Sequence, residues 1–319
     1  MAGLMALIIG AIGIASLVNG TYATSLADVL SVLFGDPAND TVRMIVVEWR
    51  LPRAALAVLL GGALGMSGAI FQSLTRNPLG SPDIIGFSVG SYTGALIAII
   101  LLSGGYYETA VGSMIGGVAT ATAVYLLAWR KGVQGFRLII VGIGVAAVLS
   151  AFNTWMIREA ELNIAMSAAV WGAGSLNGLG VEQLVPVVIV LLLIMPMSCF
   201  MSRPLRQLEM GDDLACASGV HTNRARLILI LLGVALTATV TAAAGPISFI
   251  ALVAPQIARR LTRATGPALV SSALMGCLLL LFADWAAQHA FGAQLPVGVM
   301  TVSVGGMYFL WLLVRESRK

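Results

Sequence analysis

The chain is organised around one polar segment, Leu208-Glu209-Met210-Gly211-Asp212-Asp213-Leu214-Ala215-Cys216-Ala217-Ser218-Gly219-Val220. It lies between two long apolar regions, and arginines flank it at positions 203, 206, 224 and 226. Lipid offers charged and backbone groups no hydrogen-bond partners, so a segment of this kind must lie where a membrane protein meets water. We therefore expect residues 208–220 to contact a soluble partner.

The composition indicates which solvent the rest of the chain must satisfy. Of 319 residues, 59% are hydrophobic and 10% are charged, whereas ordinary soluble domains contain about 25% charged residues. One aqueous core cannot hide so many apolar side chains, so most of the surface must face lipid. The sequence predicts an all-α polytopic membrane protein, with a single transmembrane domain over residues 1–319.

About ten apolar stretches are long enough, or nearly so, to cross a bilayer, which takes about 20 residues. The predicted spans are residues 4–18, 54–74, 86–103, 110–129, 137–157, 184–202, 226–244, 247–258, 268–291 and 296–314. The eighth is short and lies between Gly245-Pro246 and Pro255, which interrupt helices. Broken backbone at membrane depth is tolerated only where protein or a cavity satisfies it. Gly245 and Pro246 are therefore candidate gate or pathway residues.

The distribution of charge predicts the orientation. With the amino terminus inside, only Arg43, Arg50, Arg53 and Arg158 fall outside. The inner loops and tail hold Arg76, Arg130, Lys131, Arg137, Arg203, Arg206, Arg224, Arg226, Arg259, Arg260, Arg263, Arg315, Arg318 and Lys319. The positive-inside rule demands this asymmetry, so we expect cytoplasmic termini and a cytoplasmic segment 203–226. Residues 19–49 become an outer connection with a surface helix from Ser25 to Phe34.

Patterns for catalysis and for metal binding are absent from the sequence. It contains no GxxxxGK[ST] phosphate loop, no HExxH motif and no nucleophile elbow. The three cysteines and two histidines lack the spacing of metal ligands, and no nucleic-acid-binding motif occurs. We expect no catalytic residue, no metal and no cofactor on this chain. If its activity consumes ATP, another chain must hydrolyse it.

Asp284 is the conspicuous ionisable residue inside the apolar spans. An intramembrane carboxylate can be a proton relay or an ion ligand, which makes an ion-coupled secondary transporter one possible function. The alternative is a structural acid that is hydrogen-bonded to a neighbouring helix. Ion-coupled carriers usually gather several polar groups at mid-membrane and this chain offers one, so the structural interpretation is favoured.

Arg50 and Arg53 open the second span at its outer face, in Glu48-Trp49-Arg50-Leu51-Pro52-Arg53. Proline suits the first helical turn, and a spacing of three places both guanidinium groups on one side of the helix. Two outward cations can pair with carboxylates of a docking protein or with an anionic solute. Snorkelling to the membrane interface is the alternative.

Asn77 and Pro78 belong to a connector, residues 76–86, that holds two prolines and two glycines. This composition predicts a rigid, non-helical link between two apolar spans. Asn77 and Pro78 are candidate gate or pathway residues, and a simple turn of the chain is the alternative.

The polar segment predicts a short surface helix over residues 214–218. Gly211 interrupts the preceding helix, Asp212 is the expected N-cap, Asp213 adds charge to the first turn, and Gly219 suits the position after the end. Such a helix, with alanines 215 and 217 exposed, could enter a cleft on a partner, and a capped surface turn is the alternative. The candidate contact residues are Gly211, Asp212, Asp213, Leu214, Ala215, Ala217 and Gly219.

Five ordered motifs resemble one transporter family. They are Arg50-Leu51-Pro52-Arg53, Asn77-Pro78-Leu79-Gly80-Ser81-Pro82, Gly211-Asp212-Asp213 with Gly219-Val220, Gly245-Pro246-Ile247-Ser248-Phe249-Ile250, and Leu295-Pro296-Val297-Gly298. From about residue 48 to its end, the chain resembles permease subunits of the iron-siderophore and vitamin B12 importers, which are type II ABC importers. Shorter stretches, such as residues 174–178, look most like permeases for ferric enterobactin, a catecholate siderophore.

The resemblance implies a ten-helix permease fold like that of the vitamin B12 importer, in the bacterial inner membrane. It also implies a second permease, a different polypeptide, so that the pair is a heterodimer. Two copies of a cytoplasmic ATPase with bound ATP and Mg²⁺ and a periplasmic siderophore-binding protein would complete the importer. The implied function is translocation of a ferric siderophore, with permeases for heme or vitamin B12 as the alternatives within the family.

The resemblance also assigns roles to residues. It implies that Arg50 and Arg53 receive acidic residues of the binding protein, and that residues 211–219 enter the ATPase cleft. The vitamin B12 importer has a further docking arginine before the Leu-Pro motif. Here Gln288 and His289 occupy that neighbourhood.

Overall fold

A computed structural model of the chain describes residues 1–20, 22, 24–35, 40–129, 135–290 and 294–316. Every regular element in these ranges is helical. In chain order the helices are α1 (Ala2–Val18), α2 (Leu26–Phe34), α3 (Asp40–Arg43), the π-helix η1 (Met44–Arg50), α4 (Leu51–Thr75), α5 (Phe87–Leu96), the π-helix η2 (Ile97–Leu101), α6 (Tyr106–Ala128), α7 (Gly135–Glu159), α8 (Leu162–Gly172), α9 (Val181–Phe200), α10 (Ser202–Met210), α11 (Asp212–Ala217), α12 (Thr222–Ala244), α13 (Ile250–Thr262), α14 (Leu269–His289) and α15 (Val297–Glu316).

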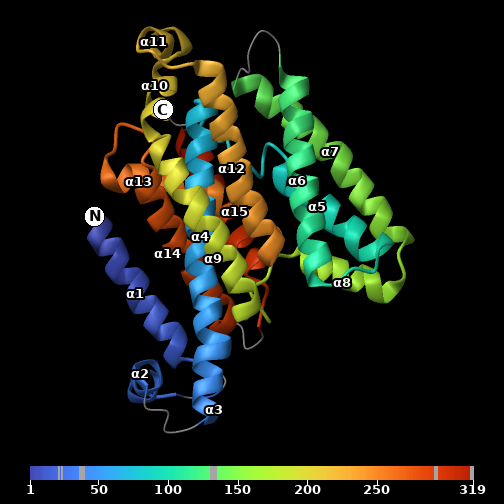
Figure 1. The fold of residues 1–319 in the computed structure, drawn as a ribbon, viewed down its shortest axis with the longest axis vertical. Helices are drawn as coiled ribbons and strands as arrows, with labels where there is room; N and C mark the ends of the chain where they lie inside the picture. The colour runs from blue at the N-terminus through green and yellow to red at the C-terminus, as the bar shows by residue number, and fades with distance from the viewer. Residues whose placement is uncertain (21, 23, 36–39, 130–134, 291–293, 317–319) are drawn as a thin grey trace.

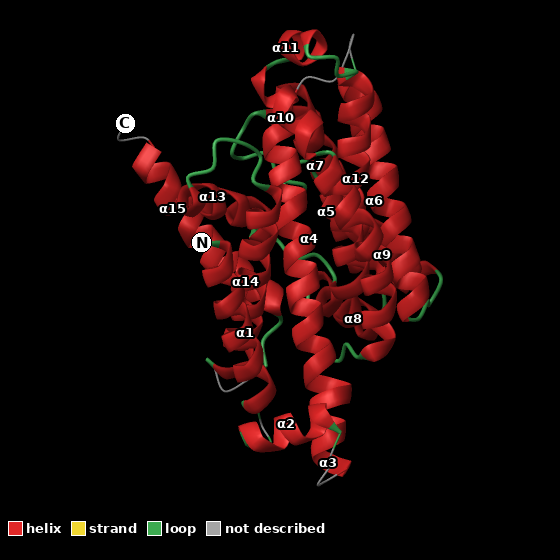
Figure 2. Ribbon diagram, turned by 60° about the vertical axis from the view of Figure 1, so that its left-hand side comes forward, coloured by secondary structure: helices red, strands yellow, loops and turns green. Residues whose placement is uncertain are grey.

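Helix α4 is the centre of the bundle. It runs through the middle of the molecule, with α9 and α12 on one side and α14 on the other (Figures 1 and 2). Glycines allow the backbones of α4 and α14 to touch, because a methyl group at Gly61 or Gly65 would overlap the carbonyl oxygen of Gly276 or Ser272. Lipid supplies no hydrophobic drive between helices, so close backbone packing of this kind stabilises the pair.

Six helical segments in the described ranges are long and apolar enough to cross a bilayer. They are Asp40–Thr75, Tyr106–Ala128, Gly135–Glu159, Val181–Phe200, Thr222–Ala244 and Leu269–His289. Shorter apolar helices are Ala2–Val18, Phe87–Leu101, Leu162–Gly172 and Val297–Tyr308. Each of the ten predicted spans coincides with a helix, and the expected short eighth span is α13. The fold is therefore compatible with ten crossings.

The helix predicted in the first connection is confirmed as α2 (Leu26–Phe34). The Ser25 hydroxyl accepts a hydrogen bond from the Asp28 backbone N–H at 3.1 Å, and the Asp28 carboxylate accepts one from the Ser25 N–H at 2.9 Å. This reciprocal capping box fixes the start of the helix, and Gly35 ends it with φ +98°.

Four helices were not predicted: α8, α10 and, within the predicted outer connection, α3 and η1, which run directly into α4. Helix α10 is mostly polar, with Pro204 in its first turn, so no apolar run marks it. Its buried side chains are Leu205 and Leu208, three residues apart on one face. Such a helix is amphipathic and lies along the bundle end.

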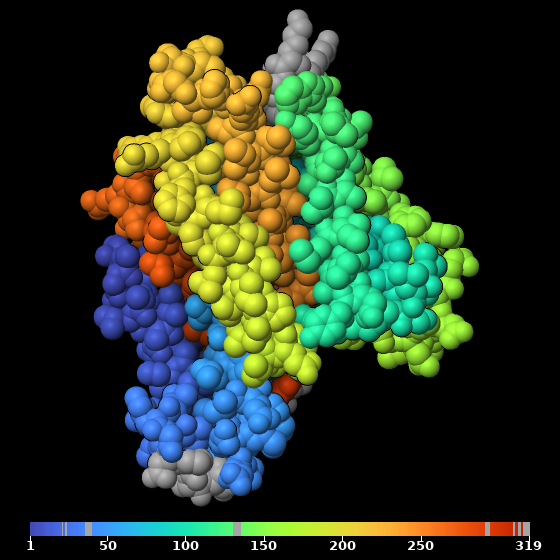
Figure 3. Space-filling model, viewed as in Figure 1, coloured from blue at the N-terminus to red at the C-terminus, as the bar shows by residue number. Residues whose placement is uncertain are grey.

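The two ends of the bundle differ. Helix α11 projects beyond α10 and α12 at one end, and α2 and α3 lie at the other (Figure 1). The space-filling view shows α11 as a separate knob above the bundle (Figure 3). Below, these ends are called the α11 end and the α2 end.

Candidate functional site

Helix α11 is a single short helix bounded by two glycines. Gly211 has φ +123° and Gly219 has φ +87°, conformations that glycine adopts without steric cost. The expected position of Gly219 after the helix end is confirmed. The prediction that Asp212 is the N-cap is wrong, because Gly211 occupies that position and Asp212 is the first helical residue.

One face of α11 is exposed and the other is buried. Leu214 is 58% exposed and Ala217 is also exposed, whereas Ala215 is fully buried in the main hydrophobic core. The prediction that Ala215 faces a partner is therefore wrong, because Ala215 lies on the side of α11 that packs against the bundle. The exposed face carries Asp213, Leu214 and Ala217.

Asp212 ties α11 to two long helices. Its Oδ1 accepts hydrogen bonds from Nη2 of Arg76 and from Nη2 of Arg226, both at 2.8 Å, and its Oδ2 lies 3.1 Å from the same Arg226 nitrogen. Arg76 ends α4 and also donates through Nε to the Leu208 carbonyl at 3.2 Å. Arg226 lies in the first turns of α12 and is 7% exposed. Asp212 therefore links α11 to α4 and α12.

Asp284 forms a bidentate ion pair with Arg53. Arg53 Nε lies 3.0 Å from Oδ2 and Nη2 lies 2.8 Å from Oδ1, and the Asp284 side chain is 4% exposed. Gln288, one turn along α14, donates to Oδ2 at 2.8 Å. A buried carboxylate with these three donors has its charge compensated, which is the arrangement expected of a structural acid.

Arg50 is also bonded within the chain. Its Nη1 donates to the Leu17 carbonyl at 2.7 Å and to the Thr24 hydroxyl at 2.8 Å, and its Nη2 donates to the Tyr22 carbonyl at 2.6 Å. Both guanidinium groups are therefore engaged within the chain, and the predicted role of Arg50 and Arg53 in docking stays a prediction. Arg50 holds the link between α1 and α2, and Arg53 joins α4 to α14.

Both arginines nevertheless line one cavity of about 910 Å³ at the α2 end. Glu48, Glu182 and Gln288 contribute further polar groups to its wall. The predicted placement of the two guanidinium groups on one side of the helix agrees with this shared cavity.

The connector that contains Asn77 and Pro78 is bound to α13. The Pro78 carbonyl accepts a hydrogen bond from Gln256 Nε2 at 3.0 Å. One helical turn away, Gln72 of α4 donates to the Leu252 carbonyl at 2.8 Å. Two buried amide side chains therefore hold α13 against the end of α4 and the connector.

The second break, Gly245-Pro246, lies before the other end of α13. Gly245 has φ +74° and packs against the Trp171 carbonyl. The Ser175 N–H donates to the Ala244 carbonyl at 2.8 Å, and the Gly298 N–H donates to the Gly174 carbonyl at 2.9 Å. Three distant stretches thus meet here and satisfy the broken backbone, as a break at membrane depth requires.

The candidate residues form three groups on one frame. Asp212 and its arginines lie at the α11 end, and the Arg53–Asp284 pair lies beside the cavity at the α2 end. The two breaks flank α13 between them. Among the described residues, no group of three or more His, Cys, Asp or Glu side chains could hold a metal ion. Through these hydrogen bonds and ion pairs the three groups link the helices of the bundle to one another.

Comparison with known proteins places this frame in a family. A model of the FecCD transport family matches residues 7–315. The chain belongs to the FecCD transport family. It is 51% identical over 308 residues to the ferric enterobactin transport system permease protein FepG of Escherichia coli K12, an alignment that covers 96% of this chain and 93% of FepG.

Other relatives agree. The chain is 36% identical over 317 residues to the achromobactin permease CbrC of Dickeya dadantii, with 97% of this chain and 90% of CbrC covered. A solved structure described as an inward-facing conformation of a metal-chelate type ABC transporter matches with a TM-score of 0.88 and 25% identity, over 98% of each chain. The predicted all-helical polytopic fold and the predicted FecCD-type family are confirmed.

The sequence did not reveal the ion pairs of this FecCD protein. Asp212 and Arg76 are 136 residues apart, and Arg53 and Asp284 are 231 apart, so no local spacing connects them. One signal was available for the second pair. Arg53 begins the second predicted span and Asp284 lies near the outer end of the ninth, so the two opposite charges share a membrane depth.

Proposed function

We propose that this chain is the transmembrane permease subunit of an ABC importer that moves a ferric siderophore across the bacterial inner membrane. The proposed substrate is ferric enterobactin or a related catecholate. The observation that carries this proposal is the 51% identity to FepG over 96% of the chain. Permeases for heme or vitamin B12 are the alternatives within the family.

The proposed importer needs further subunits. A second permease, a different polypeptide, pairs with this one as a heterodimer, and two copies of an ATPase bind ATP and Mg²⁺ in the cytoplasm. A periplasmic protein delivers the siderophore. In this assembly the present chain binds no cofactor and catalyses no reaction.

The proposed orientation places the α11 end in the cytoplasm, with both termini on that side. Residues 203–226 are then the cytoplasmic coupling segment, residues 19–49 are the periplasmic connection, and residues 1–319 form one permease domain. The exposed arginines 203, 206 and 224 beside α11 support this orientation.

In the proposed mechanism, α11 enters a cleft on the ATPase. Its exposed Leu214 offers an apolar anchor, while Ala217 is small enough for close approach. When ATP binding closes the ATPase, α11 moves and Asp212 passes the displacement to α4 and α12. Helix α13, which the glutamines hold to α4 and the connector, carries the motion to the breaks at Asn77-Pro78 and Gly245-Pro246, which act as the gate.

The cavity at the α2 end is the proposed docking site of the binding protein. Asp284 neutralises Arg53, so the ion pair supports the helices there. Arg50 forms no ion pair with a described residue and remains the cation available to a carboxylate of the binding protein.

Reconstituted vesicles test the proposal. Vesicles with both permeases and the ATPase, supplied with the binding protein and ferric enterobactin, should take up iron only when they contain ATP. Ferric hydroxamates, heme and vitamin B12, each offered under the same conditions, are the controls for substrate class. Uptake driven by an ion gradient without ATP would contradict the ABC mechanism and favour coupling through Asp284.

A further inference from the structure

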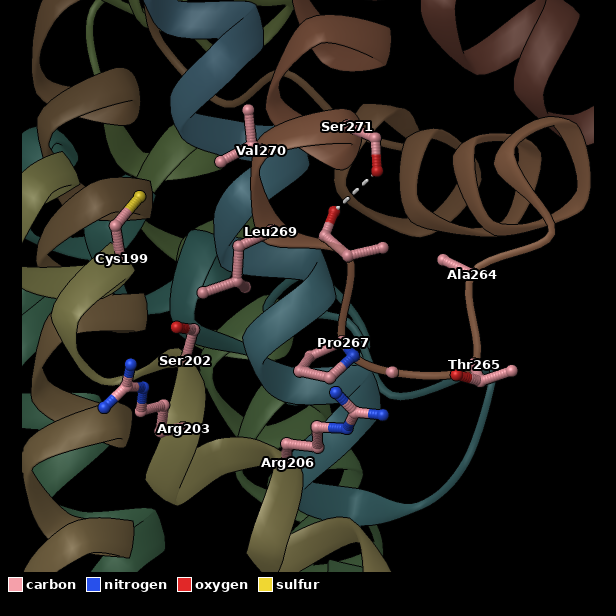
Figure 4. A pocket seen from close by; sticks show the side chains of 12 residues that line it. Cys199, Ser202, Arg203, Arg206, Ala264, Thr265, Pro267, Leu269, Val270 and Ser271 are labelled. Carbon is pink, nitrogen blue, oxygen red and sulfur yellow. Dashed lines mark hydrogen bonds between the residues drawn. The ribbon is translucent and has the colours of Figure 1, made fainter. Parts of the chain in front are cut away.

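A second cavity, of about 540 Å³, lies at the α11 end between the end of α9 and the start of α14 (Figure 4). Ser202, Arg203 and Arg206 contribute polar groups to its wall, and Cys199, Leu269 and Val270 contribute apolar ones. It belongs to neither the α11 contact face nor the cavity at the α2 end.

Two cations mark the polar part of this cavity. Arg203 and Arg206 lie three residues apart on α10, both are exposed, and neither forms an ion pair with a described residue. Figure 4 shows the guanidinium group of Arg206 beside Pro267 and that of Arg203 pointing to the opposite side. No acidic side chain is among the residues that line the cavity, so its charge complements an anion.

Exposed apolar side chains lie in the cavity wall and on the helix that leads to it. Val270 is 60% exposed, and α9 exposes Leu193 at 63%, Met197 at 52% and Phe200 at 82%. Helices α9 and α14 are both long enough to cross a bilayer, and the ends that meet here lie at one membrane surface. The arginines are therefore placed at headgroup level and the apolar side chains at the level of the acyl chains.

We propose that this cavity binds the headgroup of an anionic phospholipid from the inner leaflet, an assignment that rests on the orientation in the proposed function. The Arg206 guanidinium group holds the phosphate, because arginine binds phosphate through paired N–H donors, and Arg203 adds positive charge to the cavity wall. The Ser202 hydroxyl is a further donor. Basic cavities between transmembrane helices on the cytoplasmic side are suited to such lipids, and the apolar wall accepts acyl chains that a soluble phosphate lacks.

The position of the cavity gives the lipid a consequence for transport. Helix α10 carries both arginines and leads through Gly211 into α11. A lipid bound between α10 and the start of α14 therefore stabilises the position of α10, which directly precedes the proposed coupling helix α11. Transport per ATP should depend on anionic lipid in the membrane.

Native mass spectrometry of the purified complex tests lipid binding directly. Phosphatidylglycerol should remain bound in preference to phosphatidylcholine with the same acyl chains. The double variant Arg203→Gln with Arg206→Gln should weaken phosphatidylglycerol binding by roughly tenfold or more, since each basic residue near an anionic surface contributes appreciably. The matched control is Arg137→Gln with Arg224→Gln, which removes the same charge from the same predicted membrane face outside the cavity and should keep wild-type binding.

Three results would overturn the proposal. Equal weakening in the control would show general attraction to charge, and displacement of the lipid by millimolar inorganic phosphate would show a site for a soluble anion. Unchanged lipid binding with loss of the ATPase subunit from the double variant would make the cavity a protein contact. Lipid binding is measured without transport, so failure of siderophore uptake with intact lipid binding would count against the proposed function alone.

Discussion

Replacing Asp212 with alanine should separate ATP hydrolysis from transport. The substitution removes the carboxylate that joins α11 to Arg76 and Arg226. The exposed face of α11, with Leu214 and Ala217, is unchanged, so the ATPase should still bind and hydrolyse ATP. What is lost is the connection from α11 to α4 and α12.

The expected size of the effect follows from exposure. The Arg226 side chain is 9% exposed, and a hydrogen bond to a charged group of this kind contributes about 1.5–3 kcal/mol. The Arg76 side chain is 46% exposed, so its pair contributes only about 0–1 kcal/mol. The two contributions sum to about 1.5–4 kcal/mol, and the half-exposed carboxylate lowers this total to about 1.5–3 kcal/mol. Loss of half of it from the coupled state lowers transport per ATP by about four- to tenfold.

Siderophore uptake and phosphate release, measured in the same vesicles, give the ratio directly, as the number of siderophores transported per ATP hydrolysed. Asp213→Ala is the matched control, because Asp213 is the adjacent exposed acid and forms no ion pair with a described residue. Asp212→Glu, which keeps the charge, should restore part of the ratio. An unchanged ratio in Asp212→Ala, or an equal fall in Asp213→Ala, would refute the role of this carboxylate.

Three further changes test other parts of the frame. Arg53→Gln should lower the unfolding free energy by about 3–5 kcal/mol, because it leaves the Asp284 carboxylate buried and unpaired; thermal unfolding in detergent measures this, and replacing both residues by leucine should cost less. Arg50→Glu should weaken docking of the binding protein at low salt more than at high salt, and affinity that is equal to wild type at both would return Arg50 to a purely structural role. Gly61→Ala should destabilise the protein by about 1–3 kcal/mol, because its methyl group meets the α14 backbone, whereas Gly144→Ala, which meets open space, should leave the unfolding temperature nearly unchanged.

Much of the fold could be predicted because its signals are local. Apolar runs marked all ten predicted spans, and Gly245-Pro246 marked the start of the short eighth one. Ser25 with Asp28 and the glycine at 219 fixed helix ends, since capping acts within one turn. Helix α10 was not predicted because its two buried leucines, Leu205 and Leu208, form too short an apolar pattern to indicate a helix.

The site was less predictable, because its chemistry is tertiary. Asp212 looks like an N-cap in sequence, yet arginines of α4 and α12 engage its carboxylate. Ala215 looks equivalent to Ala217, and only the direction from which α11 packs on the bundle distinguishes them. Arg53 and Asp284 each suggested a separate role until the structure joined them.

The glycine contact between α4 and α14 determines how α4 can move. Helix α4 has 25 residues and is therefore about 38 Å long. The Arg53–Asp284 ion pair attaches one end of α4 to α14, and the Arg76–Asp212 ion pair attaches the other end to α11. A rod held in this way is a lever, and a tilt of about 5° around the end attached to α14 moves the far end by about 3 Å. At the glycine contact no side-chain ridges separate the two backbones, so in the proposed mechanism a small movement of α11 is passed along the whole length of α4.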